Sequence, residues 1–174
     1  MPLDPPYPRS RLAAFGNQLV DVHLHLREEL ARLRSDVAAH LASGGDRPRE
    51  LKAHCLAFCT ALTRHHTAED EGVFPVLARR HPELRPVLEE LSRDHEQVTE
   101  ILRAVQKLVD GLGTGPEPDP AEVRRISGEL DGLVALVESH FTYEERKLVT
   151  ALNGLDGRLP EGFADFALRD LTGT

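Results

Sequence analysis

The stretches His65-His66-Thr67-Ala68-Glu69 and His140-Phe141-Thr142-Tyr143-Glu144 carry one pattern, a histidine followed four residues later by a glutamate. In an α-helix, positions i and i+4 lie on one face, one turn apart. Each stretch follows a single histidine in an apolar run: His23 lies 42 residues before His65, and His95 lies 45 residues before His140. The chain therefore repeats one arrangement, a lone histidine and then a His–Glu pair.

Four runs of apolar residues at helical spacing surround these motifs. They are separated by turn-forming segments and span about residues 10–41, 49–79, 84–109 and 119–152. Pro75 lies in the last turns of the second run and predicts a kink or an early end there. No stretch shows the alternation of a strand. Four amphipathic helices with short connections predict an all-α, up-down-up-down four-helix bundle.

The expected domain organisation is a single bundle with two short extensions. Residues 1–9 are rich in proline and predict an extended N-terminal arm. The bundle itself covers residues 10–152. Residues 153–174 form a C-terminal tail that we expect to pack on the bundle through Phe163 and Phe166.

The apolar stripes of all four helices are interrupted by polar residues on the face that points to the core. Steps of three and four along each stripe reach these positions in turn: His23, His65, Glu69, His95, His140 and Glu144. With a rise of about 1.5 Å per residue, the six residues fall near one level of the bundle. A buried carboxylate without a partner costs several kcal/mol. We therefore expect a metal cluster, with a metal-free network of His–Glu pairs as the alternative.

Mixed imidazole and carboxylate ligands suit iron, manganese or zinc. Two carboxylates that can bridge favour two metal ions, and inward-facing glutamates and histidines on a four-helix bundle are the construction of di-iron carboxylate proteins.

With these motifs, the chain resembles the hemerythrin-like (HHE cation-binding) family over about residues 10–152. The matching segments are 22–27, 65–75, 94–96 and 140–145. The resemblance implies a non-haem di-iron centre, two iron ions with an oxo or hydroxo bridge. It also implies that Glu69 and Glu144 bridge the irons. The terminal ligands that it implies are His23, His65, His95 and His140.

On the third helix, the sequence departs from the pattern of the family's oxygen carriers. A carrier has H-x-x-x-H there, whereas Thr99 and Leu91 stand four residues after and before His95. A missing fifth histidine would leave metal positions open, which favours reaction with peroxide, NO or O₂ over reversible oxygenation. Tyr143 or a water could fill the gap, although Tyr143 could equally be a packing residue at the bundle edge.

Residues beside the expected ligands are predicted to have supporting roles. Asp70, Asp94 and Glu145 could accept hydrogen bonds from ligating imidazoles or could be solvated charges. His66 lies about 100° around the helix from His65 and is left out of the ligand set; the competing register would pair it with Asp70. His25 faces elsewhere and is expected at the surface or beside the ligands. His54 is expected to be a structural histidine, with the lining of an entry channel or a hydrogen bond to the tail as alternatives, and His40 and His81 lie near helix ends as C-terminal caps. Cys55 and Cys59 are expected to be buried, small apolar residues. For Cys55 and Cys59, the alternative is a soft-metal site with His54.

Composition limits the partners. The formal net charge of −8 argues against nucleic acid or an anionic membrane. The sequence contains no run of about 20 apolar residues, so no membrane span is predicted. The N-terminus does not resemble a signal peptide. Two cysteines one turn apart fit a reducing cytoplasm. The expected partner is a small diatomic molecule or peroxide. The protein itself is expected to be a monomer or a homodimer. A non-enzymatic oxygen or iron sensor or store is the alternative function.

Overall fold

The computed structural model describes residues 15–43, 48–113, 117 and 119–155. Its elements are α1 (Phe15–Ser43), α2 (Pro48–Ala68), the π-helix η1 (Glu69–Val73), α3 (Phe74–Arg80), the 3₁₀ turn η2 (Pro82–Leu84), α4 (Arg85–Asp110) and α5 (Pro120–Asn153). No strand occurs in these ranges. The expected N-terminal arm and nearly all of the expected tail, with Phe163 and Phe166, lie outside the described residues.

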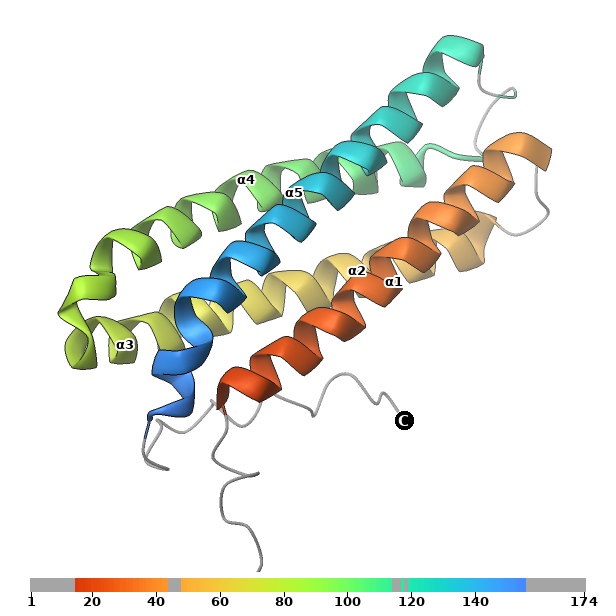
Figure 1. Cartoon of the computed structure of the whole chain (residues 1–174). Helices are drawn as coiled ribbons and strands as arrows, with labels where there is room; N and C mark the ends of the chain where they lie inside the picture. The colour runs from red at the N-terminus through yellow and green to blue at the C-terminus, as the bar shows by residue number, and fades with distance from the viewer. Residues whose placement is uncertain (1–14, 44–47, 114–116, 118, 156–174) are drawn as a thin grey trace, which may run out of the picture.

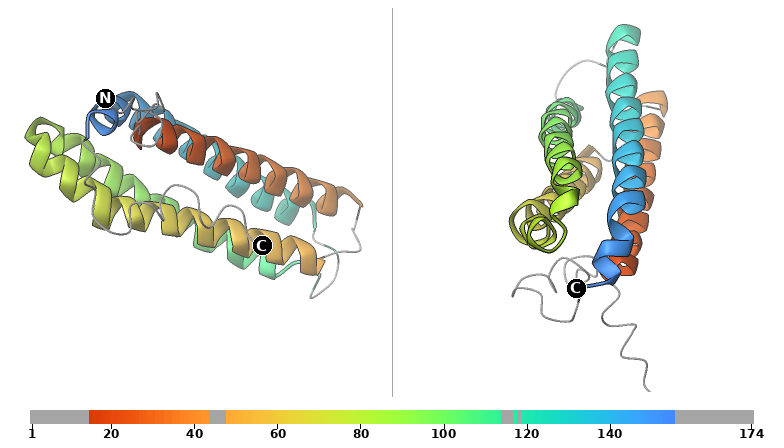
Figure 2. Two further views of the ribbon diagram at one scale, coloured as in Figure 1. Left: turned by 90° about the horizontal axis from the view of Figure 1, so that it is seen from below. Right: turned by 60° about the vertical axis from the view of Figure 1, so that its left-hand side comes forward.

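The helices form an antiparallel bundle of four rods, in agreement with the predicted fold (Figure 1). Neighbouring rods are α1 with α2, α2 with α4, α4 with α5, and α5 with α1. Figure 2 shows α1 and α5 as one layer and α2 with α4 as the other. Every rod therefore has two neighbours, and side chains on its inner face can turn toward either of them.

Pro75 does not end the second rod. Pro75 has no N–H, and its ring would clash with the carbonyl of the residue four positions earlier in a regular helix. The chain instead widens into η1, where the N–H of Phe74 donates to the carbonyl of Glu69, five residues earlier. Helix α3 then continues to Arg80. The predicted early end is thus replaced by a π-turn, a feature that often occurs at functional sites.

Three residues with strong local conformational preferences shape the connection between α4 and α5. Gly113 has φ of 75°, a left-handed conformation that favours glycine. Asp119 then caps α5, because its side chain accepts a hydrogen bond of 2.9 Å from the N–H of Glu122. Pro120 begins the helix, where a missing N–H costs nothing.

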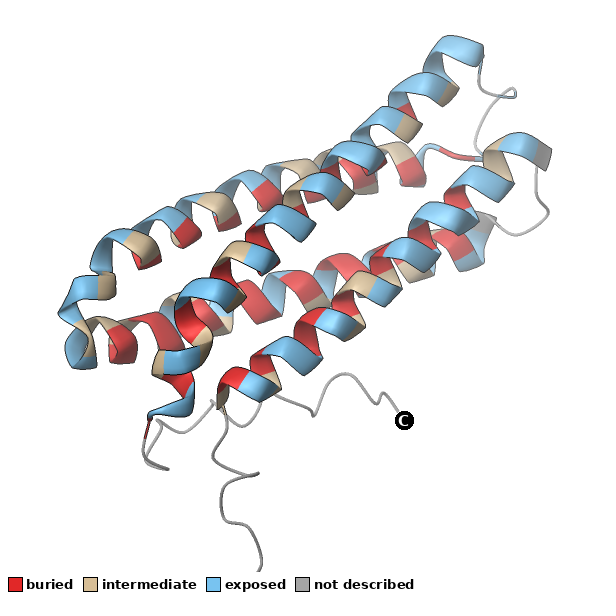
Figure 3. Ribbon diagram, viewed as in Figure 1, coloured by how far each residue is buried: buried red, intermediate tan, exposed pale blue. Residues whose placement is uncertain are grey.

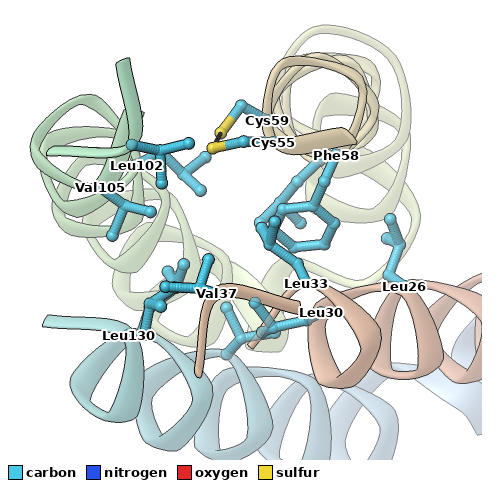
Figure 4. Packing of buried hydrophobic residues seen from close by; sticks show 14 of the residues in the cluster. Leu26, Leu30, Leu33, Val37, Cys55, Phe58, Cys59, Leu102, Val105 and Leu130 are labelled. Atoms are coloured by element: carbon cyan, nitrogen blue, oxygen red, sulfur yellow. Dashed lines mark hydrogen bonds between the residues drawn. The ribbon is translucent and has the colours of Figure 1, made fainter. Parts of the chain in front are cut away.

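The apolar core is divided into two clusters. One extends from Val22 and Leu62 toward the α1–α2 and α4–α5 connections, and Figure 4 shows a part of it. The other contains Leu19, Val73 and Leu148. Each rod crosses from one cluster to the other at its inward-facing polar residues.

The start of α1 lies against the end of α5. The N–H of Gly16 donates to Oδ1 of Asn153 at 2.8 Å, and a Cβ at Gly16 would lie 2.9 Å from the Cα of Val149. We expect Gly16→Ala to lower the free energy of unfolding by about 1–3 kcal/mol, because the helices would have to separate. Urea unfolding measures this change. Gly132→Ala is the matched control: nothing lies within 4 Å of its Cβ position, so it should stabilise α5 by about 0.5–1 kcal/mol. Equal midpoints for the two variants would contradict the close contact.

Candidate metal centre

Buried positions line the inner faces of the rods (Figure 3). Between the two apolar clusters, these buried positions carry polar side chains and form a polar layer across the bundle. Each rod contributes to it, and none of its members is more than 6% exposed. The layer consists of His23 from α1, His65 and His66 from α2, Glu69 from the first position of η1, His95 from α4, and His140 and Glu144 from α5. The six sequence-predicted ligands are thus brought together, with His66 as a seventh member.

The first half of the layer joins α1, α2 and α5. His23, His65, Glu69 and Glu144 each offer a ligand atom within 4.8 Å of the others. Nε2 of His65 lies 3.0 Å from Oε1 of Glu69, and Nε2 of His23 lies 3.3 Å from Oε2 of Glu144. This half therefore has two imidazoles and two carboxylates around one small volume.

The second half joins α2, α4 and α5. His66, Glu69, His95 and His140 meet the same distance criterion. Glu69 belongs to both halves, because its Oε2 lies 3.3 Å from Nε2 of His95 while its Oε1 faces His65. Oε2 of Glu144 lies 3.7 Å from Nε2 of His140 and so also reaches a histidine of each half. Both glutamates are placed where they could bridge two cations.

Three carboxylates outside the layer orient its histidines. The Nδ1–H of His23 donates to Glu145 at 2.9 Å, that of His95 to both oxygens of Asp70 at 3.0 Å, and that of His140 to Asp94 at 3.2 Å. Each of these carboxylates lies next to a layer residue of its own helix but binds a histidine of the neighbouring helix. This contact fixes the ring and raises the basicity of the opposite nitrogen.

The oriented imidazoles face one another with nitrogen against nitrogen. Nε2 of His95 lies 3.1 Å from Nε2 of His140, and Nε2 of His23 lies 3.0 Å from Nε2 of His65. In the His95–His140 pair both Nδ1 atoms carry the donated hydrogen, so two lone pairs point at each other when both rings are neutral. A cation between the two nitrogens removes this repulsion. The donor set therefore fits a metal ion, with a proton as its substitute in the metal-free protein.

The pKa values of the layer histidines agree with protons bound between the facing imidazoles. Burial lowers the pKa of His23, but Glu144 and Glu145 outweigh it and raise the pKa to about 9. Burial likewise opposes Asp70 and Glu69, which raise the pKa of His95 to about 10. His140 shows the reverse, because burial and His95 lower its pKa to about 4. At neutral pH, His23 therefore holds a proton in the His23–His65 pair, and His95 holds one in the His95–His140 pair.

The carboxyl of Glu144 also binds a proton more tightly than in water. Burial and the neighbouring Glu69 raise its pKa to about 8. The pKa of Glu69 is instead held well below its ordinary value, because His65 and His95 overcome the effect of burial. The two glutamates are therefore not equivalent without metal, and cations would let both ionise.

His66, which the sequence does not place among the expected ligands, lies within the buried layer. It is 4% exposed, its ring stacks on that of His95 with centroids 3.9 Å apart, and its Nε2 has no hydrogen-bond partner in the described part of the chain. The rotation of about 100° between neighbours does not remove it from the layer, since α2 packs between α1 and α4. His65 turns toward His23 on α1 and His66 toward His95 on α4. The layer therefore contains five histidines, and His66 is grouped with Glu69, His95 and His140.

The side chain of Tyr143 points away from the polar layer. Its hydroxyl donates to Glu90 at 2.9 Å at the surface, and Lys147 lies 5.6 Å from the centre of its ring. This contact holds the hydroxyl at the edge of the bundle, away from the buried layer. Phe141 lies nearer to the layer: it is fully buried, and its ring stacks on that of His23 at 3.8 Å.

The remaining candidates lie outside the layer. His54 contacts Asp36 at 3.2 Å and Glu29 at 3.3 Å, as a structural histidine would. Cys55 and Cys59 are buried free thiols with their sulfurs 4.0 Å apart, on the side of α2 that faces Leu102 (Figure 4). No grouping of three or more ligands in the described ranges includes these residues.

Comparison with known families decides the identity of the bundle. The sequence model of the hemerythrin HHE cation-binding domain matches residues 15–152. The chain belongs to this hemerythrin family. The match begins at the first residue of α1 and ends one residue before the end of α5, so it covers the bundle and the whole layer. The buried histidines and glutamates are therefore groups that could hold the cation of a hemerythrin domain.

No curated protein and no solved structure gave a significant match to this hemerythrin-like chain. None of the helices in the described ranges combines the length and apolar character needed to cross a membrane.

Proposed function

We propose that this hemerythrin-like protein holds two iron ions in the polar layer and reacts there with O₂, peroxide or NO. The observation that carries the proposal is the pair of facing Nε2 atoms of His95 and His140, 3.1 Å apart, with each Nδ1–H committed to a carboxylate. Two four-residue groups that share Glu69 support two ions rather than one. Imidazoles with carboxylates suit iron, and the buried free thiols Cys55 and Cys59 agree with a reducing cytoplasm.

The two halves offer different numbers of donors. The second half has three imidazoles, His66, His95 and His140, whereas the first has only His23 and His65. With Glu69 and Glu144 shared, the His23–His65 half retains a place for a small external molecule. Bound iron would supply redox chemistry at this place, by exchanging electrons with the external molecule. Phe141 closes one side of this half, because its ring stacks on His23 and lies 6.0 Å from His65. An apolar wall there limits access by water.

The test begins with the metal content and the absorption spectrum. Protein purified without chelator and reconstituted with Fe²⁺ under anaerobic conditions should bind two ions per chain, one for each group. Addition of peroxide, NO or O₂ should then produce new absorption bands. Consumption of peroxide would indicate an enzyme, and reversible bands with O₂ alone would indicate a sensor or store. An iron-loaded protein that reacts with none of the three would refute the proposal.

His66 provides a separate test of the ligand set. We expect His66→Leu to weaken metal binding at the second half by at least about 10–100-fold, the effect of losing an outer contact, because a donor that touches the metal is lost while leucine fills the space. Equilibrium dialysis with Co²⁺ measures the affinity. His25→Leu is the matched control, since His25 lies on α1 outside both groups. Unchanged affinity in His66→Leu would return His66 to a packing role.

A further inference from the structure

Arg27 links α1 to α5 beside the first half of the layer. Its Nε donates to Glu138 at 2.7 Å, and its Nη1 donates to Glu145 at 2.8 Å. These two glutamates stand two turns apart on α5, with Phe141 between them. The guanidinium carbon lies 5.3 Å from the centre of the Phe141 ring. Arg27 thus contacts three residues on one face of α5.

Two of these three contacts lead directly to His23. Oε1 of Glu145 accepts hydrogen bonds from both Arg27 and the Nδ1–H of His23. The ring of Phe141 lies nearly parallel to that of His23, with an interplanar angle of 6°. Glu145 therefore sets the rotation of the imidazole and Phe141 sets its plane, and Arg27 contacts both.

The second half of the layer has no such cation. His95 and His140 are oriented by Asp70 and Asp94, and no lysine or arginine in the described residues forms an ion pair with either aspartate. Asp70 instead accepts a hydrogen bond of 2.7 Å from the hydroxyl of Ser92. The arginine is a feature of one half alone.

We propose that Arg27 is a positioning residue for the His23–His65 half of the metal centre. It holds Glu145 and Phe141 so that Nε2 of His23 is directed at the cation, and metal affinity in this half therefore depends on the α1–α5 ion pair. The inference rests on the proposed two-metal function. It adds that the two halves are supported differently, and that one of them can be weakened from a residue outside the ligand set.

The physical basis is the behaviour of Glu145 once Arg27, the cation that it shares with Glu138, is removed. Glu145 is only 22% exposed, and without Arg27 its charge is better solvated when the side chain turns outward. His23 then loses the acceptor that fixes its tautomer. Loss of such an outer contact lowers metal affinity by about 10–100-fold. The second half keeps Asp70 and Asp94 and should be unaffected.

The experiment is a Co²⁺ titration of the full chain, followed by visible absorption. In Arg27→Gln, one of the two binding steps should weaken by about 10–100-fold while the other stays as in the wild type. Arg27→Lys should recover most of the loss, because an ammonium group can still reach Glu145. Equal weakening of both steps, or no recovery with lysine, would overturn the proposal.

Arg34→Gln is the matched control. Arg34 also connects α1 to α5, through an ion pair of 2.6 Å with Asp131, but it is exposed and has no contact with the layer. Its removal should leave both Co²⁺ steps unchanged. If Arg34→Gln weakens binding as much as Arg27→Gln does, Arg27 acts only by holding the helices together and the proposal is wrong.

A second measurement needs no metal. The Nδ1 proton of His23 should give a downfield, slowly exchanging proton NMR signal in the metal-free protein, because it is buried and bonded to Glu145. In Arg27→Gln this proton should exchange faster with water and its signal should broaden, because Glu145 then keeps only His23 as its partner; Arg34→Gln should leave the signal unchanged. Should Arg27→Gln fail to fold, Glu138→Gln at an exposed position tests the same ion pair. It should weaken the same Co²⁺ step by a smaller factor, and unchanged affinity would count against the proposal.

The outcomes separate the two levels of the argument. A wild-type chain that binds neither Co²⁺ nor iron would refute the metal function itself. A wild-type chain that binds two ions, with Arg27→Gln indistinguishable from it, would refute only the role of Arg27.

Discussion

Glu69→Ala is expected to abolish binding at both halves of the layer. Glu69 is the only residue that belongs to both groups of candidate ligands in the described part of the chain, and its two oxygens face His65 and His95. Removal of a shared ligand should reduce the affinity of both positions by more than about 100-fold, beyond the usual effect of an outer contact. Metal analysis after dialysis measures the loss. Glu144→Ala should also lower the metal content.

Glu71→Ala is the control for this experiment. Glu71 belongs to the same π-turn, but its side chain is exposed. It should keep the wild-type metal content and the wild-type spectrum. Equal loss in Glu71→Ala and Glu69→Ala would mean that the π-turn has been disrupted as a whole, and that the assignment of Glu69 as the shared ligand is wrong.

The metal-free and metal-loaded proteins should respond to pH in opposite directions. Without metal, His23 and His95 have pKa values raised from 6.5 to about 9 and about 10. Their contribution to stability is fully present below pH 6.5 and is lost as the pH rises through those values. The raised pKa of Glu144, about 8, acts in the same direction. The melting temperature of the metal-free protein should therefore fall by roughly 5–10 °C between pH 7 and pH 10.

Bound metal removes this alkaline loss, because the ligands are then already deprotonated. The metal-loaded protein should instead lose metal and stability as the pH falls through the histidine range, where protons compete for the same nitrogens. Thermal scans of both forms at matched pH check the prediction. The metal-loaded form also serves as the control for lysine and tyrosine titration. Parallel curves for the two forms would show that the layer does not exchange protons for cations.

The sequence was sufficient to predict the layer but not its full membership. His23, His95 and Glu144 lie where steps of three and four along each stripe meet the core, and such steps can be read directly from the sequence. His66 was missed because the periodicity defines one inner face for each helix. Helix α2 has two neighbours, α1 and α4, and so presents adjacent residues to two different partners. The number of neighbours is a tertiary property.

The sequence also predicts the contacts that orient the histidines only in part. Asp70, Asp94 and Glu145 stand next to expected ligands, so a role in hydrogen bonding could be considered. Their actual partners lie on other helices, and that assignment depends on the rotation of each rod about its axis. Tyr143 shows the same dependence: its hydroxyl reaches Glu90 on α4 instead of the interior. The π-turn before Pro75 required the backbone itself.

The carboxylates beside the layer each orient an imidazole that belongs to another rod: Asp70 of η1 binds His95 of α4, Asp94 of α4 binds His140 of α5, and Glu145 of α5 binds His23 of α1. Truncating the protein after α4 would therefore do more than delete the donors of α5. It would also leave His23 without its acceptor, so a shortened chain should hold no cation at all instead of retaining one of two. Assembly of the metal centre and closure of the bundle are in this sense a single event.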